Sequence, residues 1–128
     1  MLGASKTEKQ NFYDIIRTKL LSGETIEMID GMRRSVLSYK TAASLLFALS
    51  EPDSVPQILN VCGDDSYTKY EMGVKLAELF RADQSLVRKI SEEEGRKFFR
   101  DRRASDAAMD NTLLKNLLNL DEIKWECE

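Results

Sequence analysis

Apolar residues recur at helical spacing near the start of the chain and predict a helix over residues 10–21. Its apolar stripe consists of Phe12, Ile15, Ile16 and Leu20. Thr7 and Gln10 have the spacing of a capping box at its start, and Gly23 is a typical stop after its last turn. This first segment therefore predicts an amphipathic helix with one buried face.

Three further stretches show the same periodicity and predict helices over residues 38–49, 68–80 and about 110–118. Their apolar faces are Ala42, Leu45, Leu46 and Leu49 in the first, Tyr70, Val74, Ala77 and Phe80 in the second, and Leu113, Leu114, Leu117 and Leu118 in the third. Ser38 can cap the first helix, and Thr68 with Glu71 has capping-box spacing in the second. Ser91 with Glu94 predicts a short acidic helical turn.

Short apolar runs between these helices predict strands at residues 25–29, 33–37, 57–62 and 86–90, of which 57–62 is the best. Alternating helices and strands indicate a small, helix-rich α/β fold with few short strands. Such a sheet is either minor or an extension of a sheet that belongs to another domain. We expect one domain over residues 1–128, with a loose tail at 121–128 in which Ile123 and Trp125 can dock.

Composition limits the classes of function. The 128 residues carry a net charge of -3, with 42% hydrophobic and 32% charged residues, which is typical of a globular domain. The acidic balance argues against nucleic-acid binding, and no apolar run is long enough to span a membrane, so we expect a cytoplasmic protein. The chain has no His and two distant cysteines, Cys62 and Cys127, which we interpret as packing residues; a zinc site is excluded in practice.

Nucleotide-binding loops and catalytic motifs are missing from the sequence. No G-x-G-x-x-G or Walker-type glycine loop follows a predicted strand, so we expect no cofactor to bind this chain. The acidic run at residues 92–94 is better explained as a solvated helix start than as paired catalytic carboxylates.

Two arginine pairs are the remaining candidates for binding chemistry. Arg33-Arg34 leads into a predicted strand, and Arg102-Arg103 lies in a loop between helical segments. A guanidinium group binds two phosphate oxygens at once because its planar fork matches them and keeps its charge. Two such pairs on ordered loops can converge on one pyrophosphate. The alternative, a solvated or salt-bridged surface, remains open from the residues alone.

Motifs in order along the chain resemble the C-terminal third of the extended short-chain dehydrogenases/reductases, the NAD-dependent epimerase/dehydratase family. Leu2-Gly3-Ala4-Ser5 resembles its Y-G-P-S, Asn11-Phe12 its N-F, Gly23-Glu24 its G-E/K, Arg34-Ser35-Val36-Leu37 its R-S-P-T, Leu59-Asn60-Val61-Cys62-Gly63 its Y-H/N-V-S-G, Ser66 to Glu71 its S-x-x-E helix entry, Arg102-Arg103 its R-R-P, and Met109 to Leu114 its L-D-N-S-x-L. Within the family, the chain is most similar to dTDP-4-dehydrorhamnose reductases.

The resemblance implies a substrate-binding part that is normally joined to an N-terminal Rossmann domain, which is absent here. In such a protein, NAD or NADP bound by the Rossmann domain carries the hydride. The family pattern implies that Arg34 and Arg103 contact a dTDP- or UDP-linked sugar. It also implies that Asn11, at a helix N-terminus, faces the pyrophosphate, where the helix dipole favours an anion.

The sequence departs from the family pattern at four positions. Lys40 and Thr41 stand where the family has an acidic pair, and Val36 and Ala104 each replace a proline. The family's Tyr-x-x-x-Lys pair is also missing, so we expect the chain to be catalytically silent alone. These departures support an alternative, a non-catalytic interaction module with the same fold. For a fragment of the enzyme, removal of the partner domain exposes apolar surface, from which we expect some homodimer.

Overall fold

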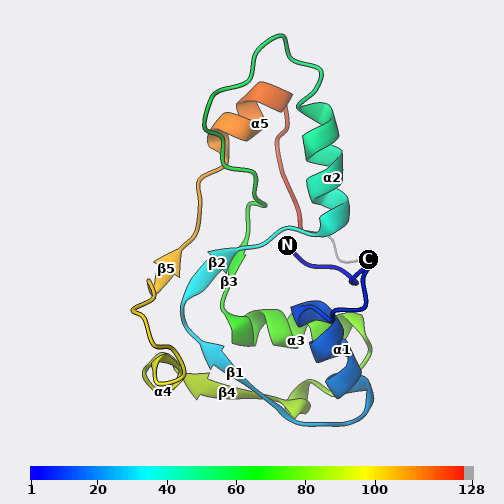
Figure 1. Cartoon of the computed structure of the whole chain (residues 1–128), viewed down its shortest axis with the longest axis vertical. Coiled ribbons are helices and arrows are strands. Elements are labelled where there is room, and N and C mark those ends of the chain that lie inside the picture. Colours follow the sequence, from blue (N-terminus) through cyan, green and yellow to red (C-terminus); the bar gives the residue numbers. More distant parts are fainter. Residues whose placement is uncertain (126–128) are drawn as a thin grey trace. The chain divides into compact units, whose positions relative to one another are not determined.

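The computed structural model describes residues 1–125 and shows a small, helix-rich α/β fold, which confirms the predicted fold class (Figure 1). Its helices are α1 (Phe12–Leu21), α2 (Tyr39–Ala48), α3 (Lys69–Leu79), α4 (Glu92–Arg96) and α5 (Thr112–Leu118), with a 3-10 turn η1 (Gln84–Leu86). Its strands are β1 (Ile26–Asp30), β2 (Arg33–Ser35), β3 (Ser66–Tyr67), β4 (Val87–Ser91) and β5 (Asp106–Ala107). None of the helices in this described part is long and apolar enough to cross a bilayer.

The chain divides into two compact units. Unit 1 comprises residues 1–3, 35–66 and the part of the chain from 108 onward, and unit 2 comprises residues 4–34 and 67–107. Each unit is described by itself. That the two units make up one domain stays a prediction.

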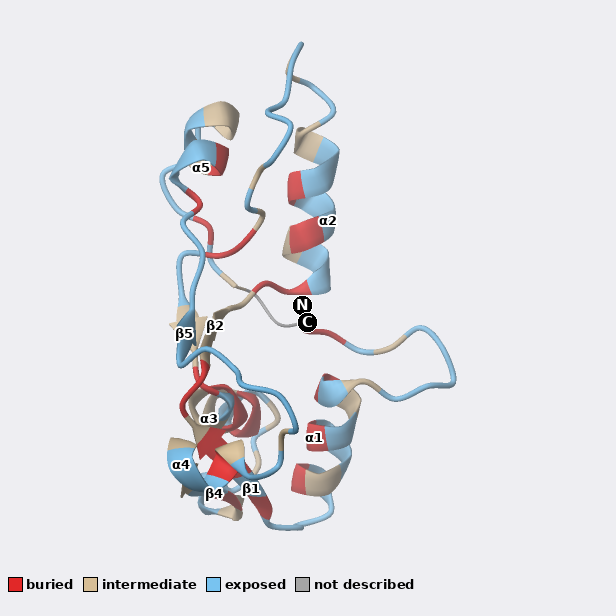
Figure 2. Cartoon of the chain, turned by 60° about the vertical axis from the view of Figure 1, so that its left-hand side comes forward, coloured by how far each residue is buried: buried red, intermediate tan, exposed pale blue. Residues whose placement is uncertain are grey.

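Unit 2 is organised around a parallel strand pair. β1 pairs with β4 in the register Ile26↔Val87 to Asp30↔Ser91. The core consists of Tyr13, Ile16, Leu20, Ile26, Met28, Ile29, Met32, Met72, Leu76, Ala77 and Val87. A Cβ on Gly73 would collide with the Met28 side chain, so the glycine lets α3 lie close against β1. Figure 2 shows this buried layer in red.

The helix ends of unit 2 follow the local sequence closely. The capping boxes of α3 (Thr68 with Glu71) and α4 (Ser91 with Glu94) are both present, as predicted. For α1 the predicted box was wrong, because the cap is Asn11 with Asp14 rather than Thr7 with Gln10. Thr7 instead bonds with Ser5 and accepts no bond from the helix.

The stop predicted after α1 is confirmed. Gly23 adopts φ +75°, a left-handed conformation that glycine reaches without steric cost, and the N–H of Glu24 donates to the carbonyl of Lys19. Together these features end the helix and turn the chain toward β1.

A second, short sheet has the strand order β3-β2-β5. β2 and β5 are parallel, with Arg33 opposite Asp106 and Arg34 opposite Ala107. The carbonyl of Ser105 also accepts a hydrogen bond of 2.7 Å from the N–H of Arg33. The segment before β5 is therefore held against the arginine-bearing strand.

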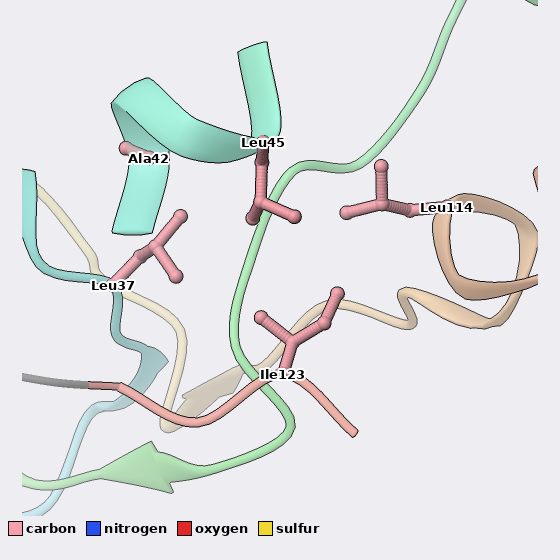
Figure 3. Close-up of a cluster of buried hydrophobic side chains, with 5 residues drawn as sticks. All are labelled: Leu37, Ala42, Leu45, Leu114 and Ile123. Carbon is pink, nitrogen blue, oxygen red and sulfur yellow. The ribbon is translucent and has the colours of Figure 1, made fainter. Parts of the chain in front are cut away.

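Unit 1 gathers its core between α2, α5 and the segment before the C-terminus. Ser38 caps α2 by accepting the N–H of Thr41, as predicted. The buried cluster consists of Leu37, Ala42, Leu45, Leu114 and Ile123, whose side chains converge in Figure 3. Ile123 is buried, so the predicted docking of this residue in the tail is confirmed.

Several residues that we predicted on the buried faces of helices are exposed in the structure. Phe12, Ile15, Leu46 and Leu113 are exposed. In α3 the buried face is Met72, Gly73, Leu76 and Ala77, where we predicted Tyr70, Val74, Ala77 and Phe80. Periodicity alone favours the largest apolar residues, whereas α3 turns its small glycine and alanine toward the sheet because close packing requires them there.

The predicted strand at residues 57–62 was wrong for this structure, which has no strand there. A strand needs a neighbour to complete its hydrogen bonds, and sequence propensity says nothing about whether one exists. Instead, side chains tie the segment in place: Asn60 Nδ2 donates to the carbonyl of Asp110 at 2.9 Å, and the carbonyl of Cys62 accepts from Asn111 Nδ2 at 3.0 Å.

Candidate functional site

The two arginines of β2 have different surroundings. Arg33 forms an ion pair of 2.8 Å with Glu71, whose pKa is lowered by the Thr68 N–H and by this guanidinium. Because Glu71 also caps α3, Arg33 ties β2 to the start of that helix. Arg33 is thus part of the scaffold.

Among the described residues, the Arg34 side chain is held by backbone carbonyls only. Its Nη1 donates to the carbonyl of Arg33 at 2.7 Å and to the carbonyl of Ala104 at 3.2 Å. Within residues 1–125, no carboxylate lies within 4.0 Å of its guanidinium. The bond to Ala104 brings Arg34 directly beside the residue that follows Arg103. The guanidinium group of Arg34 is therefore held in place by two carbonyls, and its charge has no acidic partner in this part of the chain.

Arg103 is oriented by an aromatic ring. Its guanidinium carbon lies 4.1 Å from the centre of the Phe99 ring, and Lys69 Nζ lies 5.6 Å from the same centre. Stacking on an aromatic face restricts the arginine side chain. It does not use the N–H groups, which lie in the plane of the guanidinium group. Arg103 is exposed, and no acid within the described residues pairs with it. No hydrogen bond within the described residues uses the N–H groups of its side chain.

A hollow of about 250 Å³ lies between the end of α4 and the loop that carries Arg103. Arg96, Phe99, Arg100, Asp101, Arg102 and Arg103 line it. The lining has four arginines and one carboxylate, Asp101, and Arg96 is paired with Glu92, so positive charge remains in excess there although the whole chain is acidic. An anion with several negative charges is the ligand class that such a lining favours.

One supporting residue was missed by sequence reasoning. Arg96 donates through Nη1 to the carbonyl of Arg103 and through Nη2 to Ser105 Oγ, both at 2.8 Å, and it pairs with Glu92. Ser105 Oγ donates to Glu92 at 2.6 Å, and this bond, together with Arg96, lowers the pKa of Glu92. The i,i+4 spacing of Glu92 and Arg96 was the available signal. Glu92 thus lies in the first turn of α4, as predicted for the acidic run, and is an ion-pair partner of Arg96.

Asn11 does not join this group of arginines. In both Figure 1 and Figure 2, α1 lies on one side of unit 2 and α4 with β5 on the other. The Asn11 side chain caps α1, and the carboxylate of Asp14 accepts the N–H groups of Asn11 and Ser5. An internal carboxylate therefore already occupies the place where we expected a pyrophosphate. The structure places Arg34 beside the backbone of Ala104, the residue after Arg103, and leaves Asn11 apart.

Lys40 and Thr41, two of the departures from the family pattern, lie on a separate hollow of about 360 Å³ in unit 1. Its lining is Lys40, Thr41, Ser44, Leu45, Leu120, Glu122, Ile123 and Lys124. Lys124 pairs with Glu122 at 3.2 Å, so the lining carries little net charge. This hollow has less positive charge than the arginine hollow of unit 2 and gives no comparable indication of an anion.

No group of His, Cys, Asp and Glu able to hold a metal ion occurs among the residues that the structure describes. Cys62 is buried, which raises the pKa of its thiol, and its sulfur lies 3.6 Å from the carbonyl of Met109. Its predicted packing role is confirmed. Cys127, given the same role, lies outside the described residues.

No protein-family model and no curated protein matches the sequence. Among solved structures, the chain is similar to dTDP-glucose 4,6-dehydratase from Bacillus anthracis in complex with NAD, with a TM-score of 0.63 and 14% identity over 88% of this chain and 34% of that one. It is also similar to DesIV, a dTDP-glucose 4,6-dehydratase from Streptomyces venezuelae with NAD and TYD bound. There the TM-score is 0.60 and the identity 19% over 88% of this chain and 33% of that one. The chain thus has the fold of about one third of these dehydratases.

Proposed function

We propose that this chain is the nucleotide-sugar-binding portion of an NAD(P)-dependent enzyme of the extended short-chain dehydrogenase/reductase family. In this proposal, Arg34 and Arg103 bind the diphosphate of a dTDP- or UDP-linked sugar. The remaining two thirds of such an enzyme include a Rossmann domain that binds the cofactor. The chain alone binds substrate and performs no redox step.

The observation that carries this proposal is the hydrogen bond from Arg34 to the carbonyl of Ala104. It joins two arginine segments that lie about 70 residues apart in sequence at one place in unit 2. Neither guanidinium has an acidic partner within the described residues, and Phe99 restricts the second one. Two preorganised guanidinium groups lose little side-chain entropy when they bind a diphosphate.

The fold likeness to two dTDP-glucose 4,6-dehydratases supports a sugar-nucleotide substrate. The finer assignment, to a reductase of the dTDP-4-dehydrorhamnose type, depends on the motifs from Leu2 to Leu114 and not on those two structures. Asn11 is included in the proposal as the cap that sets the start of α1. Its contact with substrate requires the Asp14 carboxylate to move away.

The division of labour with the cofactor domain follows from what this chain lacks. The sequence has no glycine-rich turn between a strand and a helix, so its residues do not fit the pyrophosphate of NAD. In this proposal, hydride transfer takes place on the cofactor domain and not on this chain. What its own residues provide is positive charge at the 96–103 hollow, held by Phe99 and Arg96.

Calorimetry on the isolated chain tests this proposal directly. We expect dTDP to bind weakly and NADH not to bind. The double change Arg34→Ala, Arg103→Ala should reduce dTDP affinity by at least about 10-fold, since each charged hydrogen bond contributes about 1.5–3 kcal/mol. Arg17→Ala is the matched control, because Arg17 is an exposed arginine of α1 in the same unit. Unchanged affinity in the double variant would remove the proposed site.

A second candidate, a non-catalytic interaction module, is favoured by the exposed side chains Leu46, Phe47 and Ile58. It predicts a native start at Met1 and no dTDP binding. The coding sequence upstream of Met1 separates the two candidates, because the enzyme requires a glycine-rich βαβ unit there.

A further inference from the structure

The loop before β5 carries a serine shortly after its two arginines. The sequence there is Arg102-Arg103-Ala104-Ser105, so the hydroxyl follows the guanidinium groups by two and three residues. All four residues are exposed, and none belongs to a helix or strand. Serine kinases select an extended peptide by its pattern of charge, and an acidic groove pairs well with two guanidinium groups. The segment therefore has the features of a substrate for an arginine-directed serine kinase.

A second serine follows basic residues at the same spacing but lies in an ordered element. Arg88-Lys89-Ile90-Ser91 has this charge pattern within β4, where Ser91 lies opposite Asp30 of β1. The Ser91 hydroxyl also caps α4, because it accepts the N–H of Glu94 at 3.1 Å. A kinase would have to separate β4 from β1 to extend this peptide. Ser105 is thus the accessible serine of the two, and Ser91 serves as an internal control.

The hydroxyl of Ser105 lies between a cation and an anion. Its Oγ accepts a hydrogen bond of 2.8 Å from Arg96 Nη2 and donates one of 2.6 Å to Glu92 Oε1. Arg96 also donates through Nη1 to the carbonyl of Arg103. A group attached to this oxygen therefore meets a guanidinium group directly and removes the hydrogen bond to the carboxylate.

A phosphoryl group on Ser105 would change the local balance of charge. It removes the proton that Glu92 accepts, and it adds up to about two negative charges and three acceptor oxygens. Like charge repels Glu92, whereas Arg96 already lies 2.8 Å from the serine oxygen and can exchange its carboxylate partner for the phosphate. All of these residues, and the 96–103 hollow, belong to unit 2. The attached anion then competes with a free diphosphate for the positive charge of that hollow.

We propose that Ser105 is a phosphorylation site for an arginine-directed serine kinase, and that its phosphate weakens diphosphate binding at the arginine hollow. The γ-phosphorus of ATP forms a bond to Ser105 Oγ while its bond to the β,γ-bridging oxygen breaks and ADP leaves. The hydroxyl proton passes to the base of the kinase. The effect on binding rests on the proposed function, because it concerns the same site, whereas the modification requires no ligand.

A tethered phosphate is an effective competitor even though it is a single group. A short tether gives it an effective concentration on the order of millimolar. The chain alone is expected to bind dTDP weakly, so an anion at that concentration displaces it. Because the phosphate is removed only by hydrolysis, its effect persists when the free nucleotide concentration changes.

Phosphorylation of the 128-residue chain tests the site. The purified chain is incubated with Mg-ATP and a recombinant serine kinase that selects arginine two and three residues ahead of its serine, and tandem mass spectrometry locates the phosphate. We expect phosphate at Ser105 in the unaltered chain and in Ser91→Ala, and none in Ser105→Ala. A chain that takes up no phosphate, or takes it up at Ser91 alone, would overturn the proposal.

Two arginine variants test the recognition. Arg102 has no hydrogen bond or ion pair within residues 1–125, so its replacement leaves the fold intact. Arg102→Ala should slow phosphorylation at least about 10-fold, because one charged pair with the kinase is lost. Arg100→Ala, which lies outside the two recognised positions, should leave the rate unchanged. Equal rates in both variants and the unaltered chain would contradict recognition of the arginine pair.

Calorimetry tests the effect on binding. Phosphoserine placed at residue 105 during translation should weaken dTDP binding at least about 10-fold. Phosphoserine at residue 85, an exposed position of η1 outside the hollow, adds the same charge and should leave the affinity unchanged. Equal weakening by both, or by neither, would overturn the regulatory part. Phosphorylation at Ser105 in a chain that never binds dTDP would remove the proposed function and leave the modification site standing. Binding of dTDP by a chain that the kinase does not modify would do the reverse.

Discussion

Units 1 and 2 both contain helices, yet they differ in how the backbone groups outside the helices form hydrogen bonds. Unit 2 contains the five-residue parallel pair of β1 and β4, and its helices bury their faces on that pair. Unit 1 has a cluster of five buried residues, one isolated bridge at Leu2, and a strand-like segment without a partner. The contrast indicates that unit 2 is organised around a sheet, whereas unit 1 is organised around a cluster of apolar side chains, with no strand formed at residues 57–62.

Charge is also divided unevenly. The arginine hollow, with the Glu92–Arg96–Ser105 bonds that hold its loop, lies entirely in unit 2. Unit 1 instead concentrates its polar contacts on Asp64, which accepts from Asn111, Lys115 and the N–H of Ile123. In unit 2 the polar network positions a candidate binding loop, and in unit 1 it fixes the C-terminal segment to the core.

The largest expected effect distinguishes the two cores. Leu76 in unit 2 and Leu114 in unit 1 are both fully buried. Leu76→Ala should lower the free energy of unfolding by about 3–4 kcal/mol, and Leu114→Ala by about 2–3 kcal/mol, because the cavity in a smaller cluster collapses more easily. Urea titration followed by circular dichroism measures both. An equal or greater loss for Leu114→Ala would break the comparison.

A smaller effect is expected at Arg96, which holds the binding loop of unit 2. Arg96→Met removes its bonds to Arg103, Ser105 and Glu92 and should destabilise the chain by about 1 kcal/mol, a value reduced for solvent screening. Hydrogen exchange should accelerate at residues 103–107 and stay constant in unit 1.

The control for that change is Arg100→Met. Arg100 lines the same hollow, but the structure gives it no hydrogen bond or ion pair within residues 1–125. It should leave exchange at residues 103–107 as in the unaltered chain. If both variants accelerate exchange equally, total charge and not the bonds of Arg96 holds the loop.

Local sequence rules predicted the parts of this fold that depend on neighbours in sequence. The caps at Ser38, Thr68 and Ser91 and the stop at Gly23 were found as expected, because each needs only residues three or four positions away. The cap of α1 was misplaced by four residues, since both Thr7 and Asn11 can cap and only the packing of the helix selects between them.

Longer-range features could not be predicted from the sequence alone. The strand at residues 57–62 requires a partner that the pattern cannot supply, and the face of α3 was set by Gly73 against Met28. For the candidate site, guanidinium chemistry pointed to Arg34 and Arg103. Nothing local indicated that Arg34 reaches Ala104, that Phe99 carries Arg103, or that Asp14 fills the start of α1.

The smallest expected effect concerns the acid sensitivity of unit 1, which should depend chiefly on Asp64, because Asp110, whose pKa Thr112 also lowers, is fully exposed to screening. The pKa of Asp64 is lowered to about 2, first by the N–H of Ile123 and then by Asn111 and Lys115. A lowered folded-state pKa stabilises the fold fully above the unfolded value near 3.8, and that stability is lost as the pH falls through about 2. Because Asp64 is partly exposed, we expect a loss of about 1 kcal/mol between pH 5 and pH 2.

Trp125, the only tryptophan of the chain, reports on this loss because it belongs to unit 1. Urea midpoints from its fluorescence should fall between pH 5 and pH 2 in the unaltered chain and remain nearly level in Asp64→Asn, which has no charge to lose. Asp53→Asn, at an exposed position in the loop after α2, should keep the fall. In unit 2 the lowered pKa values are spread over Asp30, Glu71, Asp83 and Glu92, so no single change there should flatten the response. A fall that persists in Asp64→Asn would show that unit 1 also distributes its acid sensitivity, and the contrast between the units would then rest on their sheets alone.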